Sequence, residues 1–284
     1  MTQIGGLGRA APGMPLLWLR VAVVFYAMGM VYALLLLTRR SDLLARLALP
    51  AVALGMVFHF VSLTETALLE RQLTLASLHN SESLLAFVII LFFMIVYARY
   101  RTSTPGIVVF PLVFLLTFAA AMSQQEILLS TPFVRSGWIF LHIALIFIGY
   151  AALFLSFAAS LLYLIQERTL KAKQPSGILG RLPALQTIDE IGYRSLLLGF
   201  PFMTLGLMAG SVVAQSKYGA MYFHDPKIVL SLLMWAVYVV LLYTRWSSGW
   251  RGRRAAYLAT CAFAAAVIAW AANYFSAVHG FVSP

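Results

Sequence analysis

The residues best suited to chemistry in this chain are two histidines, His142 and His279, each beside aromatic side chains near one end of a long apolar run. Trp138 lies one helical turn before His142, and Tyr274 lies five residues before His279. Neutral imidazole is a strong ligand for transition metals. Two imidazoles held at the same height on two helices form a bis-histidine iron site of the kind that haem accepts. The pair therefore predicts a metal site with His142 and His279 as ligands.

A short polar and aromatic segment between two apolar runs is suited to the floor of that site. Residues 215–227 have the sequence Gln-Ser-Lys-Tyr-Gly-Ala-Met-Tyr-Phe-His-Asp-Pro-Lys. Its aromatic rings offer a π surface that matches a flat, apolar plate such as haem. Cations at the same face are available to pair with the haem propionates. The predicted contacts are Tyr218, Tyr222, Phe223, His224 and Asp225, with Lys217, Lys227 and Arg135 as the cations.

Other interpretations of these residues stay open. Aromatic side chains gather at membrane interfaces in many proteins without binding anything there. A structural zinc site needs four close ligands, often cysteines, and the chain has one cysteine, Cys261. Catalysis by a Ser-His-Asp arrangement would pair His224 with Asp225. Adjacent residues in a loop rarely orient one another in that way, and no nucleophile elbow accompanies them.

The composition indicates an integral membrane protein. Of the 284 residues, 62% are hydrophobic and 10% are charged, whereas soluble domains have roughly 25% charged and 45–50% apolar residues. The formal net charge of +11 is explained by basic residues that collect in cytoplasmic loops, so no nucleic-acid partner is expected. The single cysteine excludes an intrachain disulfide and a C-x-x-C redox pair.

Eight apolar runs are long enough to cross a bilayer, which takes about 20 residues. We therefore expect an all-α fold, a polytopic membrane helix bundle with about eight transmembrane helices in one domain over residues 1–284. The first run lacks a small-residue cleavage site and is expected to be a retained span. The runs are about 15–38, 47–68, 83–100, 106–123, 137–165, 195–214, 228–246 and 255–277.

The distribution of basic residues predicts the orientation of the bundle. Fourteen of the 20 Lys and Arg residues fall in the odd-numbered connections, which places these connections in the cytoplasm and both termini outside. On this topology four histidines lie at the outer face, and only His59 lies within a span. The four are His79, His142, His224 and His279.

The longest connection, about 168–194, is expected to be amphipathic and cytoplasmic. The fifth run is expected to project into the cytoplasm as a helix that ends near Arg168. Thr187 and Glu190 have the spacing of a capping box, which predicts a short surface helix before the sixth span. Asp189 and Glu190 have a second interpretation, as contacts for a cytoplasmic partner.

Several segments together resemble the CcsA-type cytochrome c assembly proteins, a group that also includes the HemX-like membrane proteins. The resemblance covers most of the chain from the second span onward. Its most specific parts are the Asp-Pro-Lys after the aromatic segment and the run Gly-Trp-Arg-Gly-Arg-Arg-Ala-Ala-Tyr over 249–257. The other matching segments are 206–215 with its Gly-Leu-Met-Ala-Gly start, Trp235-Ala-Val-Tyr238, Trp138-Ile-Phe-Leu-His142 with Gly149-Tyr150, and 78–84.

This resemblance implies a haem-handling protein. In the family, a tryptophan-rich loop on the outer face holds haem between two histidine ligands, which correspond by position to His142 and His279. His59 matches a histidine in an early span that serves a second, intramembrane haem position. The alternative for His59 is a hydrogen-bonded core residue.

The chain departs from the family pattern at four positions. The three tryptophan positions of the loop are Tyr218, Tyr222 and His224, and the histidine near the end of the seventh span is Tyr243. These departures are typical of the HemX-like branch, for which a role in regulating haem biosynthesis has been proposed.

The sequence therefore predicts a protein of the bacterial inner (cytoplasmic) membrane that binds b-type haem transiently at its outer face for cytochrome c assembly. Its expected partners are an apocytochrome c and a partner membrane assembly subunit. Covalent haem attachment needs the thiols of the apocytochrome, which this chain lacks. It is therefore not expected to be an enzyme on its own, and a role as a component of a haem-attachment complex stays open. The alternative function is regulation of a cytoplasmic haem-biosynthesis enzyme through the cytoplasmic loops. A transporter or channel is a weaker interpretation, because the spans offer little charge beyond His59 and Glu65.

Overall fold

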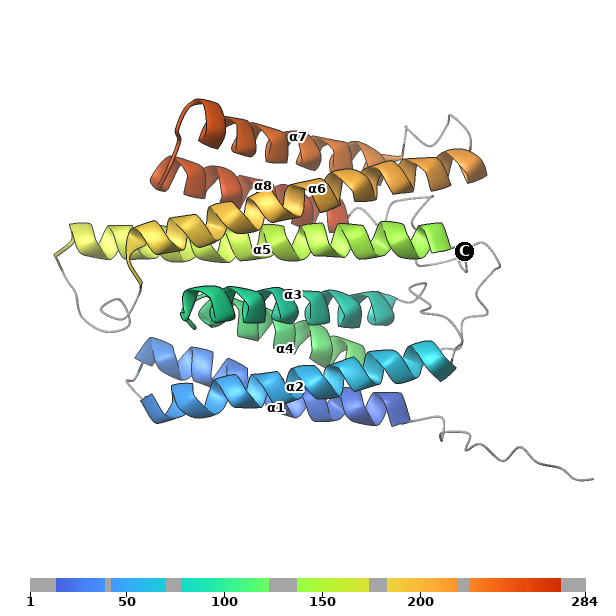
Figure 1. Ribbon diagram of the computed structural model, residues 1–284, viewed down its shortest axis with the longest axis horizontal. Coiled ribbons are helices and arrows are strands. Elements are labelled where there is room, and N and C mark those ends of the chain that lie inside the picture. Colours follow the sequence, from blue (N-terminus) through green and yellow to red (C-terminus); the bar gives the residue numbers. More distant parts are fainter. Residues whose placement is uncertain are drawn as a thin grey trace, which may run out of the picture.

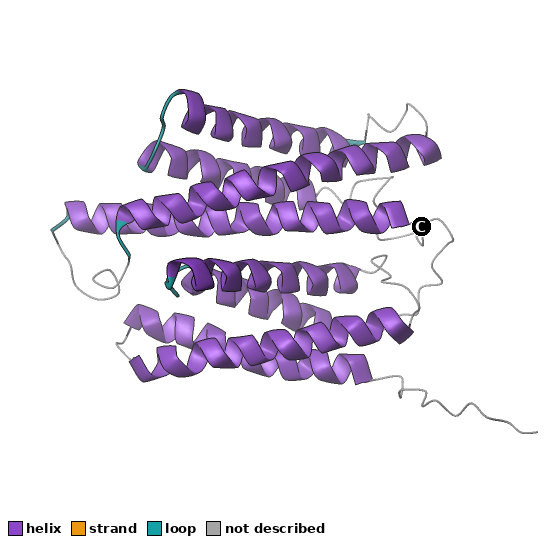
Figure 2. Cartoon of the chain, in the orientation of Figure 1, coloured by secondary structure: helices purple, strands orange, loops and turns teal. Residues whose placement is uncertain are grey.

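The computed structural model describes residues 14–38, 42–69, 78–122, 137–173, 183–218 and 225–271. In these ranges the chain forms eight helices and no strand, so the predicted all-α class is confirmed (Figures 1 and 2). The helices are α1 (Met14–Thr38), α2 (Asp42–Leu69), α3 (Leu78–Tyr100), α4 (Gly106–Met122), α5 (Gly137–Lys171), α6 (Leu185–Tyr218), α7 (Pro226–Ser247) and α8 (Arg253–Ala271).

Seven of the helices in the described ranges are long and apolar enough to cross a membrane. The eighth, α4, has 17 residues. At 1.5 Å per residue it is about 26 Å long, slightly less than the roughly 30 Å hydrocarbon core. The chain is thus a multi-span membrane protein, and α4 is its shortest helix in the described part.

Consecutive helices run in opposite directions along one common axis (Figure 1). As a result, the Met14 end of α1 and the Ala271 end of α8 lie at the same end of the bundle, together with the first residues of α5 and α7. We call this the His142 end. Which side of the membrane it faces stays a prediction from the basic residues.

Helix α5 is the central helix of the bundle. It lies between α3 and α4 on one side and α6 and α8 on the other (Figure 1). Its residues belong to two cores: Phe154 and Leu155 pack with Tyr26 and Phe93 of the first half, and Leu153 packs with the second half. Small side chains over 151–160 let the neighbouring helices approach closely, as is common for helices packed in membranes. As predicted, α5 is long and ends close to Arg168.

The predicted short surface helix before the sixth span is wrong. The α6 helix is continuous from Leu185 to Tyr218, and the backbone N–H groups of Thr187 and Ile188 both donate to the carbonyl oxygen of Ala184. Since Thr187 is already within the helix, it is not the N-cap that a capping box requires. Glu190 instead pairs with Arg194 at 2.6 Å, one turn along.

Candidate functional site at the His142 end

His142 lies in the second turn of α5, and its imidazole contacts the backbone of α6. Nδ1 is 2.6 Å from the carbonyl oxygen of Gly206. One turn further along α6, Gly210 leaves the space that the ring occupies, because a Cβ at that position would be 2.5 Å from His142 Cε1. Two glycines of one helix thus border the imidazole from the other.

This contact determines the tautomer of the neutral ring. A carbonyl oxygen only accepts hydrogen bonds, so Nδ1 must carry the proton and donate it to Gly206. The lone pair is then on Nε2, which this hydrogen bond does not use. Histidines that bind metals commonly donate their other ring N–H to a carbonyl or carboxylate, which fixes the ring and raises its basicity. The donor chemistry of His142 therefore suits an iron ligand.

The second predicted ligand, His279, lies outside the described residues, as do Tyr222, Phe223, His224 and Arg135. Tyr218 is the last residue of α6, but its side chain and that of Lys217 are outside the described part. The pairing of His142 with His279 thus stays a prediction.

His142 is on α5 and His279 follows α8 in the sequence, and these two helices pack against each other. The Phe157 and Phe263 rings are stacked with centroids 4.2 Å apart, and Phe154 adds a second contact at 5.5 Å. From these contacts α8 continues toward the His142 end as far as Ala271. His279 follows eight residues later in the sequence.

Asp225 has a structural role as the N-cap of α7. Its side chain accepts a hydrogen bond from the backbone N–H of Lys227 at 3.0 Å, and Pro226 occupies the first helical position. Aspartate at the N-cap and proline at N1 are both favoured at helix starts. The Asp-Pro-Lys sequence thus fixes where α7 begins at the His142 end, and a direct contact of Asp225 with haem stays a prediction.

His59 is fully buried on α2, and both of its ring nitrogens are engaged. Nε2 is 2.9 Å from Ser83 Oγ of α3, and Nδ1 is 3.3 Å from the Tyr26 hydroxyl of α1. The rings of Tyr26 and Phe87 pack edge-on against it. In this arrangement His59 joins three helices as a hydrogen-bonded core residue, and iron binding would require one of the two bonds to break.

Tyr243, which the sequence resemblance places where the family has a histidine, is 62% exposed on α7. The Tyr243 side chain therefore points away from the interior of the bundle. His59 is thus buried inside the bundle, whereas Tyr243 lies on its surface.

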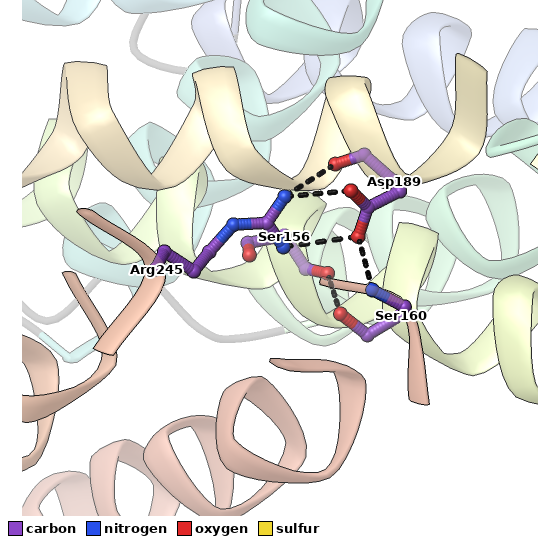
Figure 3. Close-up of polar contacts among 5 residues, drawn as sticks. Ser156, Ser160, Asp189 and Arg245 are labelled. Atoms are coloured by element: carbon purple, nitrogen blue, oxygen red, sulfur yellow. Dashed lines mark hydrogen bonds and ion pairs between the residues drawn. The ribbon is translucent and has the colours of Figure 1, made fainter. Parts of the chain in front are cut away.

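At the opposite end of the bundle, an ion pair that the sequence analysis missed joins α6 to α7. Arg245 binds Asp189 through two bonds, from Nη1 to Oδ1 at 3.0 Å and from Nη2 to Oδ2 at 2.7 Å (Figure 3). The backbone N–H of Gly252 adds a bond of 3.2 Å to Asp189 Oδ1, and the guanidinium lies 4.6 Å from the centre of the Tyr193 ring. Asp189 is thus engaged within the chain.

The hydrogen bond from Gly252 to Asp189 helps to explain the two glycines of the Gly-Trp-Arg-Gly run between α7 and α8. Gly249 and Gly252 have φ values of 62° and 65°, in the left-handed region that glycine adopts without strain. A Cβ on Gly252 would also be 2.6 Å from the Tyr163 hydroxyl oxygen. The turn therefore brings the Gly252 N–H to Asp189 while leaving room for Tyr163.

The fold and the described residues define a polytopic α-helical membrane protein with a histidine hydrogen-bonded to a backbone carbonyl near one end. The family model described as "Cytochrome C assembly protein" matches residues 75–278. The chain therefore belongs to the cytochrome c assembly protein family. The match begins just before α3, so His59 lies outside it.

Individual relatives carry related names. "Cytochrome c biogenesis protein CcsA" of Guillardia theta is 29% identical over 201 residues, which are 63% of this chain and 66% of that protein. The protein of the same name in Gloeothece citriformis is 39% identical over 102 residues, which are 36% of this chain and 30% of that protein. The match thus spans slightly less than two thirds of the first relative and under a third of the second.

Among solved structures, "Cytochrome c Heme Lyase CcmF" aligns with a TM-score of 0.65 and 18% identity. The alignment covers 99% of this chain and 52% of CcmF. The chain therefore spans about half the length of CcmF, and at this identity the likeness shows a shared fold.

Proposed function

We propose that the chain binds haem at the His142 end of the bundle through His142 and His279 and presents it for cytochrome c assembly. The observation that carries this proposal is the 2.6 Å bond from His142 Nδ1 to Gly206, because it leaves the Nε2 lone pair for iron. Membership of the cytochrome c assembly family supports haem as the ligand. Haem supplies the iron centre and is the cargo of the protein.

The remaining parts of the proposal concern the surroundings of that site. The segment from Tyr218 to Asp225, which includes Tyr222 and His224, provides the aromatic floor of the site. Apocytochrome c and a partner membrane subunit receive the haem. The protein lies in the cytoplasmic membrane of a bacterium with the His142 end outside, as the basic residues indicate. The substituted tryptophan positions suggest the HemX-like branch of the family.

The test is an absorption spectrum of the full-length protein, purified in detergent and loaded with haem. We expect the six-coordinate, low-spin spectrum of bis-histidine iron. His142→Ala and His279→Ala should each abolish it, with a loss of haem affinity greater than the roughly 10–100-fold caused by removing an outer partner of a ligand.

Cys261→Ala provides the control, because Cys261 is an exposed thiol on α8 and its removal should leave the spectrum unchanged. If the spectrum is also unchanged in both histidine variants, the assignment of these two ligands is wrong.

The alternative, regulation of a cytoplasmic haem-biosynthesis enzyme, receives less support. Asp189 is bound by Arg245 and Gly252, and Glu190 pairs with Arg194. The two acidic residues suggested as partner contacts are thus engaged within the chain.

A further inference from the structure

Helix α6 has a row of four glycines that face α5. We call Gly192, Gly199, Gly206 and Gly210 the α6 glycine face. A Cβ added to the first three would meet Ala159, Ala152 and Ile146 of α5, respectively. Such small residues let two helices in a membrane approach closely. A Cβ on Gly199 would also lie 2.6 Å from the Tyr238 hydroxyl oxygen of α7. For these three positions, close packing of helices is a sufficient explanation.

Gly210 differs because its neighbour is an imidazole ring. A Cβ there would lie 2.5 Å from Cε1, 2.6 Å from Nδ1 and 3.2 Å from Nε2 of His142. The first two distances are far shorter than any stable contact between such atoms. An alanine at position 210 would therefore displace the ring.

The ring has little freedom to move without losing its hydrogen bond. An imidazole is rigid and turns only about the two torsions of its side chain. Nδ1 is bound to the Gly206 carbonyl oxygen at 2.6 Å, four residues before Gly210 on the same face. A displacement that relieves the overlap at Gly210 would lengthen or break this bond, and with it the constraint on the tautomer.

We infer that Gly206 and Gly210 are positioning residues for His142. The Gly206 carbonyl fixes the proton on Nδ1, and the missing side chain of Gly210 lets the ring reach that carbonyl with the lone pair on Nε2. The inference rests on the proposed function, in which His142 is a haem ligand. On this inference the two glycines of the Gly-Leu-Met-Ala-Gly sequence over 206–210 position His142 in addition to packing α6 against α5.

Two glycines of the same face serve as matched controls. Gly199→Ala creates a comparable overlap, 2.5 Å from Ala152 Cβ and 2.6 Å from the Tyr238 hydroxyl oxygen, and neither of these neighbours is a histidine. Gly192→Ala brings its Cβ to 3.5 Å from Ala159 Cβ, which is an ordinary contact. If the α6 glycine face served packing alone, Gly199→Ala and Gly210→Ala would have the same effects.

The first measurement uses full-length protein loaded with haem. For Gly210→Ala we expect loss of the low-spin spectrum and a fall in haem affinity of about 10–100-fold, as for other outer partners of metal ligands. Gly199→Ala should lower the melting temperature but keep the spectrum, and Gly192→Ala should change neither. Adding Gly210→Ala to His142→Ala should cause no further loss of affinity, because two changes that act through one group are not additive.

The second measurement needs no haem. Nitrogen-15 NMR of labelled histidines, assigned with His142→Ala, reports which ring nitrogen carries the proton. The wild type and Gly199→Ala should show His142 protonated at Nδ1, and Gly210→Ala should lose that signature.

The outcomes separate the two proposals. The inference is overturned if Gly210→Ala keeps the spectrum and the Nδ1 signature, or if Gly199→Ala loses them equally. If the wild type takes up no haem, the proposed function is wrong. In that case loss of the Nδ1 signature in Gly210→Ala still supports the positioning of His142, and its retention refutes it.

Discussion

His142 and His59 are the two histidines with described side chains, and they differ in how their ring nitrogens are used. His142 has one nitrogen bound to a backbone carbonyl, whereas both nitrogens of His59 meet hydroxyl groups. A metal ligand must offer a lone pair, and a core histidine must have its polar atoms satisfied. The same residue type thus serves two purposes, and the hydrogen-bond partners distinguish them.

We predict that His59→Ala destabilises the protein but leaves the haem spectrum unchanged. The substitution leaves the Tyr26 hydroxyl and Ser83 without their shared partner, and a buried polar group left unpaired costs about 1–3 kcal/mol. The measurement is thermal unfolding in detergent, with the absorption spectrum recorded on the same samples. Ser83→Ala removes only one of the two bonds and should cost less. A low-spin spectrum that disappears with His59 would instead make this residue an iron ligand.

At the scale of helices, α6 is fixed to both of its neighbours in the second half of the bundle. Toward α5 it presents glycines, and toward α7 it presents Phe200, whose ring is stacked with Trp235 and Tyr238. The Tyr238 hydroxyl also donates to the carbonyl oxygen of Leu196 at 3.2 Å. The Trp-Ala-Val-Tyr sequence of α7 is thereby explained as packing between α6 and α7.

We predict that breaking the Asp189–Arg245 pair destabilises the protein much more than breaking an exposed pair does. Their side chains are only 17% and 10% exposed, and breaking a buried pair by removing one partner costs about 3–5 kcal/mol. Arg245→Ala should therefore lower the unfolding midpoint strongly, and Arg245→Lys should restore it only in part, because lysine lacks the two-pronged geometry.

The control is the Lys171–Glu167 pair on α5, whose lysine is 67% exposed. Lys171→Ala should cost at most about 1 kcal/mol. Equal midpoints for Arg245→Ala and Lys171→Ala would show that the inner ion pair does not hold α6 to α7.

For the whole molecule, the alternating helices place Met14 and Ala271 at one end and the turn between α7 and α8 at the other (Figure 1). The described basic residues are concentrated at the end opposite His142, and they include Arg99, Arg168, Lys171, Arg251, Arg253 and Arg254. Because cytoplasmic segments are rich in Lys and Arg, we expect the His142 end to be outside.

Cysteine labelling in intact cells tests this orientation. In a Cys261→Ala background, Thr2→Cys should react with a membrane-impermeant maleimide from outside. Ala172→Cys, in the exposed turn after α5, should react only after the cells are opened. The reverse pattern would place His142 on the cytoplasmic side and contradict presentation of haem outside.

Much of the fold could be predicted from the sequence because bilayer helices need long apolar runs, and these are local features. The start of α6 was predicted wrongly because the Thr187–Glu190 spacing also fits the interior of a helix, and the polar segment before the sixth apolar run suggested a separate element. Asp189 was assigned to capping because nothing near it in the sequence indicates Arg245, 56 residues away.

By itself, the sequence determined the membrane class, the helices and the residue types available for iron, because hydropathy and side-chain chemistry are properties of short segments. Only the tertiary structure decided which nitrogen of His142 donates to α6 and that His59 is bound on both sides. It also decided that Asp189 belongs with Arg245. These are contacts between helices distant in sequence, and the direction of a ring or a carboxylate depends on the neighbour against which it packs.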